Sequence, residues 1–189
     1  IGNLESSVAT CVVTRKTGIT DIKTLQTRET LFGTTGGGGA LTQFTLAARN
    51  LAGIKAKLVS GYQGAASIGL AMQNGELEGM CGANTSFISS FWSNEVASGV
   101  FKVILQLNGP KRPDLAGVAH AYDLVRSDED RTVLDLIYGP LILGRIYAAP
   151  PSLPAERVAG ADRAAADEIA AVLRPTCRMR LPCTSTLPL

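Results

Sequence analysis

The stretch ETLFGTTGGGGALTQFTLAARNL, residues Glu29 to Leu51, decides the fold of this chain. Its first five residues, Glu29–Gly33, favour a strand, and from Ala40 to Leu51 the apolar residues recur every three or four positions, as on one face of a helix. A turn with four consecutive glycines, Gly36 to Gly39, separates the two. The stretch therefore predicts a strand, a glycine turn and a helix in that order.

The same order recurs along the rest of the chain. Short apolar or β-branched runs predict further strands, and segments of helical periodicity follow most of them. The predicted strands are Val8–Thr14, Lys55–Tyr62, Leu77–Ala83 and Phe101–Leu107, and the predicted helices are Ala65–Gly75, Phe87–Trp92, Asp128–Tyr138 and Pro154–Leu173. Alternating strands and helices predict an α/β fold with a parallel-rich sheet covered by helices. Residues 174–189 have no periodicity and predict an irregular tail.

Composition excludes several classes of function. The 189 residues are 46% hydrophobic and 18% charged, which is typical of a globular chain, and the net charge of +2 lacks the basic surface of a nucleic-acid binder. One histidine and four cysteines without a CxxC pair predict no metal site, and no cofactor motif is present. Cys11 and Cys81 lie in apolar runs and are predicted to be small buried hydrophobes, whereas the disulfide status of all four cysteines stays open. No signal peptide or membrane-spanning run is recognisable.

Small and polar residues follow three of the predicted strands. Gly33–Gly39, Ser60–Gly64 and Asn84–Ser86 would meet where parallel strands end and helices begin, which is where ligands bind in open α/β sheets. Helix N-termini offer unpaired N–H groups and partial positive charge, so this edge predicts an anion site. Glycine lets a ligand approach the backbone and allows positive φ. Thr34 and Thr35 would add hydroxyl donors.

The anion is predicted to be a carboxylate rather than a nucleotide phosphate. No Lys-Ser or Lys-Thr follows the glycines, the last glycine of GxGxxG is missing, and no acidic residue follows the next strand. A small carboxylate needs the same donors with fewer constraints. The candidate ligand-binding residues are Gly33, Thr34, Thr35, Gly36, Gly37, Gly38, Gly39, Tyr62, Gln63, Gly64, Asn84, Thr85 and Ser86.

Two other hypotheses remain open. The chain could be a small hydrolase or transferase that binds an acyl or phosphoryl group at the same edge and uses His120 or Cys81, although the sequence identifies no partner for either residue. His120 is instead predicted to cap a helix or to lie at the surface. The third hypothesis is a non-binding interaction or regulatory remnant, with a dimer formed through an exposed lobe face.

Several motifs together resemble the substrate-binding proteins of tripartite tricarboxylate transporters, the TctC or Bug family. Gly33–Gly39 resembles the family's GSSGxGS turn and Tyr62-Gln63-Gly64 its YxG turn. Further along, Gly75–Glu78 resembles its GxxD element, Arg112–Leu115 its loop before a helix, and Ala149–Pro154 its APxGxP turn. The resemblance runs from about Ile1 to Leu173, while the tail does not continue the family's final helix.

The resemblance implies a two-lobed, venus-flytrap fold of the type II periplasmic-binding-protein kind. Residues 15–144 would form the ligand-binding lobe, and residues 1–14 and 145–173 would supply hinge strands and part of the other lobe. It also implies a non-catalytic periplasmic protein that binds a small mono- or dicarboxylate for a membrane permease. The family's opening segment would precede Ile1, so part of the ligand cleft is expected to be missing.

Overall fold

The computed structural model describes residues 2–3, 8–142, 146–147, 156 and 160. The chain divides into two compact units, one of Ser6–Leu143 and one that combines Ile1–Glu5 with Gly144–Leu189. In the latter, β1 (Gly2–Asn3) pairs antiparallel with β8 (Ile146–Tyr147). The predicted helix at 154–173, apart from Glu156 and Gly160, and the predicted tail lie outside the described residues. The division into lobe, hinge strands and tail stays a prediction.

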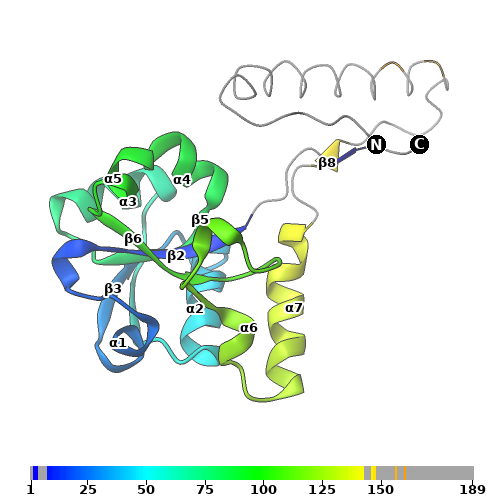
Figure 1. Cartoon of the computed structure of the whole chain (residues 1–189), viewed down its shortest axis with the longest axis horizontal. Coiled ribbons are helices and arrows are strands. Elements are labelled where there is room, and N and C mark those ends of the chain that lie inside the picture. Colours follow the sequence, from blue (N-terminus) through cyan, green and yellow to red (C-terminus); the bar gives the residue numbers. More distant parts are fainter. Residues whose placement is uncertain (1, 4–7, 143–145, 148–155, 157–159, 161–189) are drawn as a thin grey trace. The chain divides into compact units, whose positions relative to one another are not determined.

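A six-stranded sheet forms the centre of Ser6–Leu143, with strand order β4-β3-β5-β2-β6-β7 (Figure 1). Its strands are β2 (Ala9–Thr14), β3 (Thr30–Gly33), β4 (Ala56–Val59), β5 (Gly79–Asn84), β6 (Phe101–Gln106) and β7 (Ala119–His120). β3 pairs parallel with β4 and β5, and β6 parallel with β7, whereas β2 pairs antiparallel with both β5 and β6. The α/β class is therefore confirmed. The predicted parallel-rich sheet is also confirmed, although the sequence did not indicate that β2 is the antiparallel strand.

The connection from β2 to β3 returns the chain to the end of the sheet at which β2 stops. It contains the 3-10 turn η1 (Arg15–Thr17) and the six-residue helix α1 (Ile22–Thr27). The backbone N–H of Thr14 at the end of β2 donates to the carbonyl of Glu78 (2.8 Å), and the Glu78 carboxylate accepts from the N–H of Leu31 in β3 (2.9 Å). The end of β2 and the start of β3 therefore lie at the same edge.

Helices cover both faces of the sheet (Figure 1). On one face, α1, α2 (Ala40–Leu51) and α7 (Asp128–Ile142) bury Leu25, Phe44 and Tyr138. On the other, the core around Trp92 is covered by α3 (Ala65–Asn74), α4 (Thr85–Phe91) and α5 (Ser93–Ala97). The bounds of α2 agree with the sequence prediction. In the described part of the chain, no helix has the length and apolar character needed to cross a membrane.

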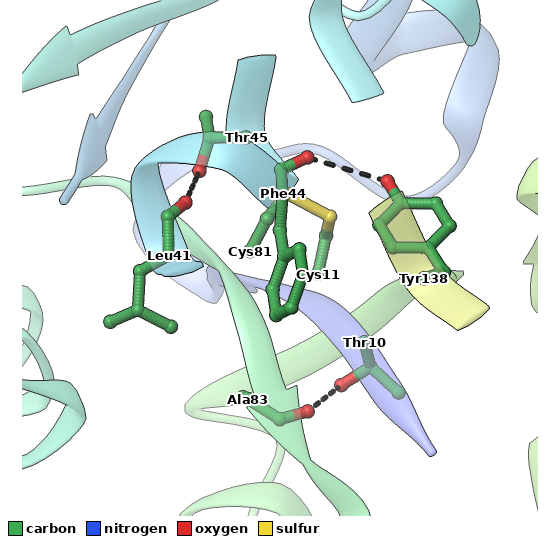
Figure 2. Close-up of a disulfide and its surroundings, with 8 residues drawn as sticks. All are labelled: Thr10, Cys11, Leu41, Phe44, Thr45, Cys81, Ala83 and Tyr138. Carbon is green, nitrogen blue, oxygen red and sulfur yellow. Dashed lines mark hydrogen bonds between the residues drawn. A yellow bond between two sulfur atoms is a disulfide. The ribbon is translucent and has the colours of Figure 1, made fainter. Parts of the chain in front are cut away.

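A disulfide joins Cys11 of β2 to Cys81 of β5 (Figure 2). The two residues are direct partners in the antiparallel ladder, with Cα atoms 4.0 Å apart, and neither is exposed. Figure 2 shows the bond beside Phe44 of α2, whose carbonyl accepts from the Tyr138 hydroxyl at 3.4 Å. The prediction that both cysteines are buried is confirmed, but they are covalently paired rather than free thiols. The pairing follows from the antiparallel register, which the sequence prediction lacked.

Replacing both cysteines, as Cys11→Ala with Cys81→Ala, is expected to lower the free energy of unfolding by about 2–4 kcal/mol. The bond closes a loop between residues 70 apart in sequence, so its loss frees the unfolded chain. Urea unfolding followed by circular dichroism measures the change. In the control, dithiothreitol should destabilise the wild-type protein and have no effect on the double variant. Equal midpoints for the two proteins would contradict the prediction.

Candidate functional site

Three neighbouring parallel strands end at one edge of the sheet, and a helix follows each of them. β3 leads through Thr34–Gly39 into α2, β4 leads through Ser60–Gly64 into α3, and β5 leads directly into α4. Gly33 and Val59, the last residues of β3 and β4, are register partners. The first two predicted segments are therefore adjacent, whereas β5 continues beyond the end of β3, since its first residue, Gly79, is the register partner of Phe32. That the third segment meets the other two stays a prediction. Their binding of a ligand stays a prediction.

Hydrogen bonds close the glycine turn onto the start of α2. The N–H of Gly39 donates to the carbonyl of Gly36 (2.8 Å), and the Thr42 hydroxyl lies 3.1 Å from the carbonyl oxygen of Thr35 and 3.0 Å from that of Gly36. Gly39 is the N-cap residue of α2 and makes no side-chain cap. In the first turn of α2, the N–H of Thr42 donates to the carbonyl of Gly39 (3.1 Å). The two N–H groups before it have no acceptor within an α-helix and can meet an anion.

The second turn is joined to the first through Thr34. The N–H of Thr34 donates to the carbonyl of Val59 (2.9 Å), and the N–H of Tyr62 donates to the carbonyl of Thr34 (3.3 Å). The Thr34 hydroxyl is 3.0 Å from that of Ser60, and Thr34 is fully buried. Thr34 therefore fixes the two turns together instead of offering a free donor. Ser60, the residue directly after β4, is absent from the predicted site residues.

Gly64 is the N-cap residue of α3, and the Ser67 side chain forms hydrogen bonds with the Gly64 backbone. The Ser67 hydroxyl donates to the carbonyl of Gly64 (2.9 Å) and accepts from the N–H of Gly64 (3.3 Å). Neither α2 nor α3 has an acidic residue in its first turn. Tyr62 is half-buried against the α3–α5 core, whereas Gln63 is exposed. Both helix N-termini therefore combine a glycine cap with no negative side chain.

Asn84, Thr85 and Ser86 differ from the predicted polar loop. Asn84 ends β5 and is the N-cap residue of α4, so Thr85 and Ser86 belong to the helix, which begins before the predicted Phe87. The N–H of Thr85 donates to the carbonyl of Val8 (2.9 Å), and Ser86 is exposed. Asn84 has extended backbone dihedrals and is followed directly by the first residue of α4, so no loop separates β5 from the helix.

Two side-chain oxygens at this edge are buried and have no hydrogen-bond partner within the part of the chain that the structure describes. They are Oγ1 of Thr35, after β3, and Oδ1 of Asn84, at the end of β5. Asn84 makes no side-chain cap on α4. Buried polar atoms are nearly always paired in folded proteins, so each of these two requires an explanation.

Only one of the two predicted reasons for glycine fits the first turn. None of Gly36, Gly37, Gly38 and Gly39 has a positive φ, so the left-handed conformation is not their reason. A Cβ on Gly36, Gly37 or Gly38 would meet nothing within 4 Å among the described residues, whereas a Cβ on Gly39 would lie 2.0 Å from Thr35 Oγ1. Gly36–Gly38 leave the backbone open, and Gly39 makes room for Thr35.

His120 and Cys81, the residues of the enzyme hypothesis, are both engaged in structural contacts. His120 is the N-cap residue of α6 (Ala121–Leu124), and its Nδ1 accepts from the N–H of Tyr122 (3.4 Å). Its Nε2 lies 2.9 Å from the carbonyl oxygen of Gly109. The predicted capping role is confirmed, and the side chain is buried instead of lying at the surface. Cys81 is oxidised.

Tyr122, which packs against the His120 ring, is not a ready proton donor or acceptor. Burial, together with the hydrogen bond from its hydroxyl to the Asp135 carboxylate (2.7 Å), raises the pKa of Tyr122 to about 12.

Two cavities of about 250 Å³ lie away from the candidate ligand edge, one between α2 and α7 and one beside Arg15 and Met72. Neither contains a predicted site residue.

Comparisons with known proteins support the fold. No protein-family model matches the chain, and no curated protein matches it by sequence. A TctC solute-binding protein from Polaromonas superposes with a TM-score of 0.51 at 12% identity, over 74% of this chain and 53% of its own. Rpa4515 of R. palustris, solved with adipate, superposes with a TM-score of 0.52 at 13% identity, over 89% of this chain and 64% of its own.

These similarities establish the fold and not the family, because both identities are low. The chain shares the α/β fold of these two structures, and its sheet is consistent with one lobe of that fold. It spans 53% and 64% of the lengths of the two similar structures.

Gly39→Ala is expected to lower the free energy of unfolding by about 1–3 kcal/mol, because the new methyl group collides with Thr35. Gly37→Ala is the matched control in the same turn, and its free energy should stay within about 1 kcal/mol of the wild-type value, since the site is open. Chemical unfolding of the two variants compares them directly. Equal stability of the two variants would show that Thr35 does not occupy the space beside Gly39.

Proposed function

We propose that this chain binds a small mono- or dicarboxylate and presents it to the membrane permease of a tripartite tricarboxylate-type transporter, without catalysis. The observation that carries the proposal is the pair of glycine-capped helix N-termini, those of α2 and α3, at the ends of the adjacent strands β3 and β4. Each helix is at least ten residues long and has no acidic residue in its first turn. An anion suits these donors.

The composition of the edge favours a carboxylate recognised through the main chain. The segments 33–39, 60–64 and 84–86 contain no charged side chain, so fixed N–H groups and a few hydroxyl and amide groups would form the contacts. Asn84 carries a donor and an acceptor on one amide and can therefore meet a carboxylate oxygen or a hydroxyl group. The residues proposed to bind are those predicted from the sequence, except that Thr34 acts through the backbone.

The proposed location is the periplasm. The Cys11–Cys81 disulfide supports it, because structural disulfides form and persist in oxidising compartments. We also propose that residues 15–144 form the ligand-binding lobe and that residues 1–14 and 145–173 supply hinge strands and part of a second lobe. Residues of that second lobe would complete the specificity of the cleft.

The enzyme alternative has less support. Cys81 has no free thiol to act as a nucleophile, because its sulfur is bonded to Cys11. Both ring nitrogens of His120 contact backbone groups that fix α6 and the Gly109 loop. The remaining alternative, a non-binding regulatory chain, predicts a stable dimer that binds no ligand.

Isothermal titration calorimetry with acetate, succinate, adipate and citrate tests the proposal. At least one carboxylate is expected to bind the 189-residue chain. Gly37→Glu should weaken that binding at least about tenfold, since a negative side chain at the open turn repels the ligand. Gly37→Gln, of the same size and without charge, is the control and should bind more tightly than Gly37→Glu. A well-folded chain that binds none of the four would contradict the proposal.

A further inference from the structure

Thr34 and Thr35 are neighbours with the same side chain but opposite hydrogen-bond states. The Thr34 hydroxyl is paired with that of Ser60 (3.0 Å). The Thr35 hydroxyl oxygen is buried and has no partner among the described residues. Leaving a buried hydroxyl unpaired is unfavourable, because the group loses its water contacts and gains nothing in exchange. The unliganded turn therefore holds one hydroxyl in an unfavourable position.

Thr35 Oγ1 lies in the space that a side chain at position 39 would need. An ideal Cβ on Gly39 would be 2.0 Å from this oxygen and 3.0 Å from the Cβ of Thr35. The hydroxyl is thus beneath Gly39, whereas Gly36, Gly37 and Gly38 have free space around them. The Thr35 hydroxyl oxygen is therefore buried next to Gly39 instead of being exposed at the open part of the turn.

The backbone around Thr35 is held, so the side-chain torsion is the freedom that remains. The carbonyls of Thr35 and Gly36 both lie within hydrogen-bond distance of the Thr42 hydroxyl, at 3.1 and 3.0 Å. Side chains occupy three staggered wells. A rotation of about 120° about χ1 therefore puts the Thr35 methyl group where its hydroxyl was and turns the hydroxyl out. In that position an apolar group fills the space under Gly39.

We propose that Thr35 is a two-position ligand contact, with its hydroxyl stored beneath Gly39 in the unliganded protein and turned outward to donate to a bound carboxylate. The methyl group then replaces the hydroxyl under Gly39. The hydrogen bond to the charged ligand gives the Thr35 hydroxyl the partner that it lacks among the described residues. This inference rests on the proposed carboxylate-binding function and assigns the hydroxyl contact to Thr35, not Thr34.

Thr35→Val tests the proposal because valine has the same shape without the hydroxyl. The unliganded variant is expected to melt roughly 2–4 °C above the wild-type protein, since an unpaired buried group is removed. Its affinity for the best-binding carboxylate of the four should fall about tenfold or more, because a hydrogen bond to a charged group is lost. Thr35→Ser keeps the hydroxyl and should bind within about threefold of the wild-type affinity.

Thr34→Val is the matched control, and it should not raise the melting temperature, because the Thr34 hydroxyl already has a partner in that of Ser60. The proposal is overturned if Thr35→Val melts at or below the wild-type temperature, or if it binds carboxylate as tightly as the wild-type protein. If the wild-type protein binds none of the four, the proposed function fails and the ligand contact fails with it. The melting temperature of unliganded Thr35→Val still decides separately whether the hydroxyl is stored without a partner.

Discussion

The structure depends on the passage of β2 between β5 and β6 in the direction opposite to theirs. All six residues of β2 are buried, and both of its edges are paired. Successive side chains of a strand point to opposite faces. Val12 therefore packs in the core covered by α3, α4 and α5, and Val13 packs in the core covered by α1, α2 and α7. One short strand thus joins two hydrophobic clusters, and the Cys11–Cys81 bond fixes it to its neighbour.

The reversed direction of β2 also places its first residues at the candidate ligand edge. The Thr10 hydroxyl donates to the carbonyl of Ala83 (2.9 Å), and the carbonyl of Val8 accepts from the N–H of Thr85 (2.9 Å). Asn84 lies between these two contacts, so its position is set by β2 as well as by β5. A parallel β2 would have brought its last residues, including Thr14, to this edge.

Local pattern was sufficient for most of the helices and strands, but it did not predict the short β7 and α5, and it was insufficient for strand pairing. The bounds of α2 could be predicted because its apolar period and the preceding glycines lie within one short stretch. The direction of β2 could not be predicted, because a run of β-branched residues does not indicate which strands it will pair with. The disulfide was missed for the same reason, since Cys11 meets Cys81 only in the antiparallel register. The candidate ligand edge was predicted from the rule that parallel strands end at the same edge of a sheet, and β3, β4 and β5 are parallel to one another.

At the candidate ligand edge, the sequence was sufficient to predict which segments lie there but not which of their side chains are hydrogen-bonded. Thr34 and Thr35 are chemically identical in the sequence, and only their surroundings, Ser60 for one and Gly39 for the other, separate them. The glycine run likewise combines open positions with one position that accommodates a neighbour. The Thr34 backbone is paired and its hydroxyl contacts that of Ser60, so under the proposed function the side chains without partners are the ones left to contact a ligand. Thr35 and Asn84 are the two that the described part of the chain provides at this edge.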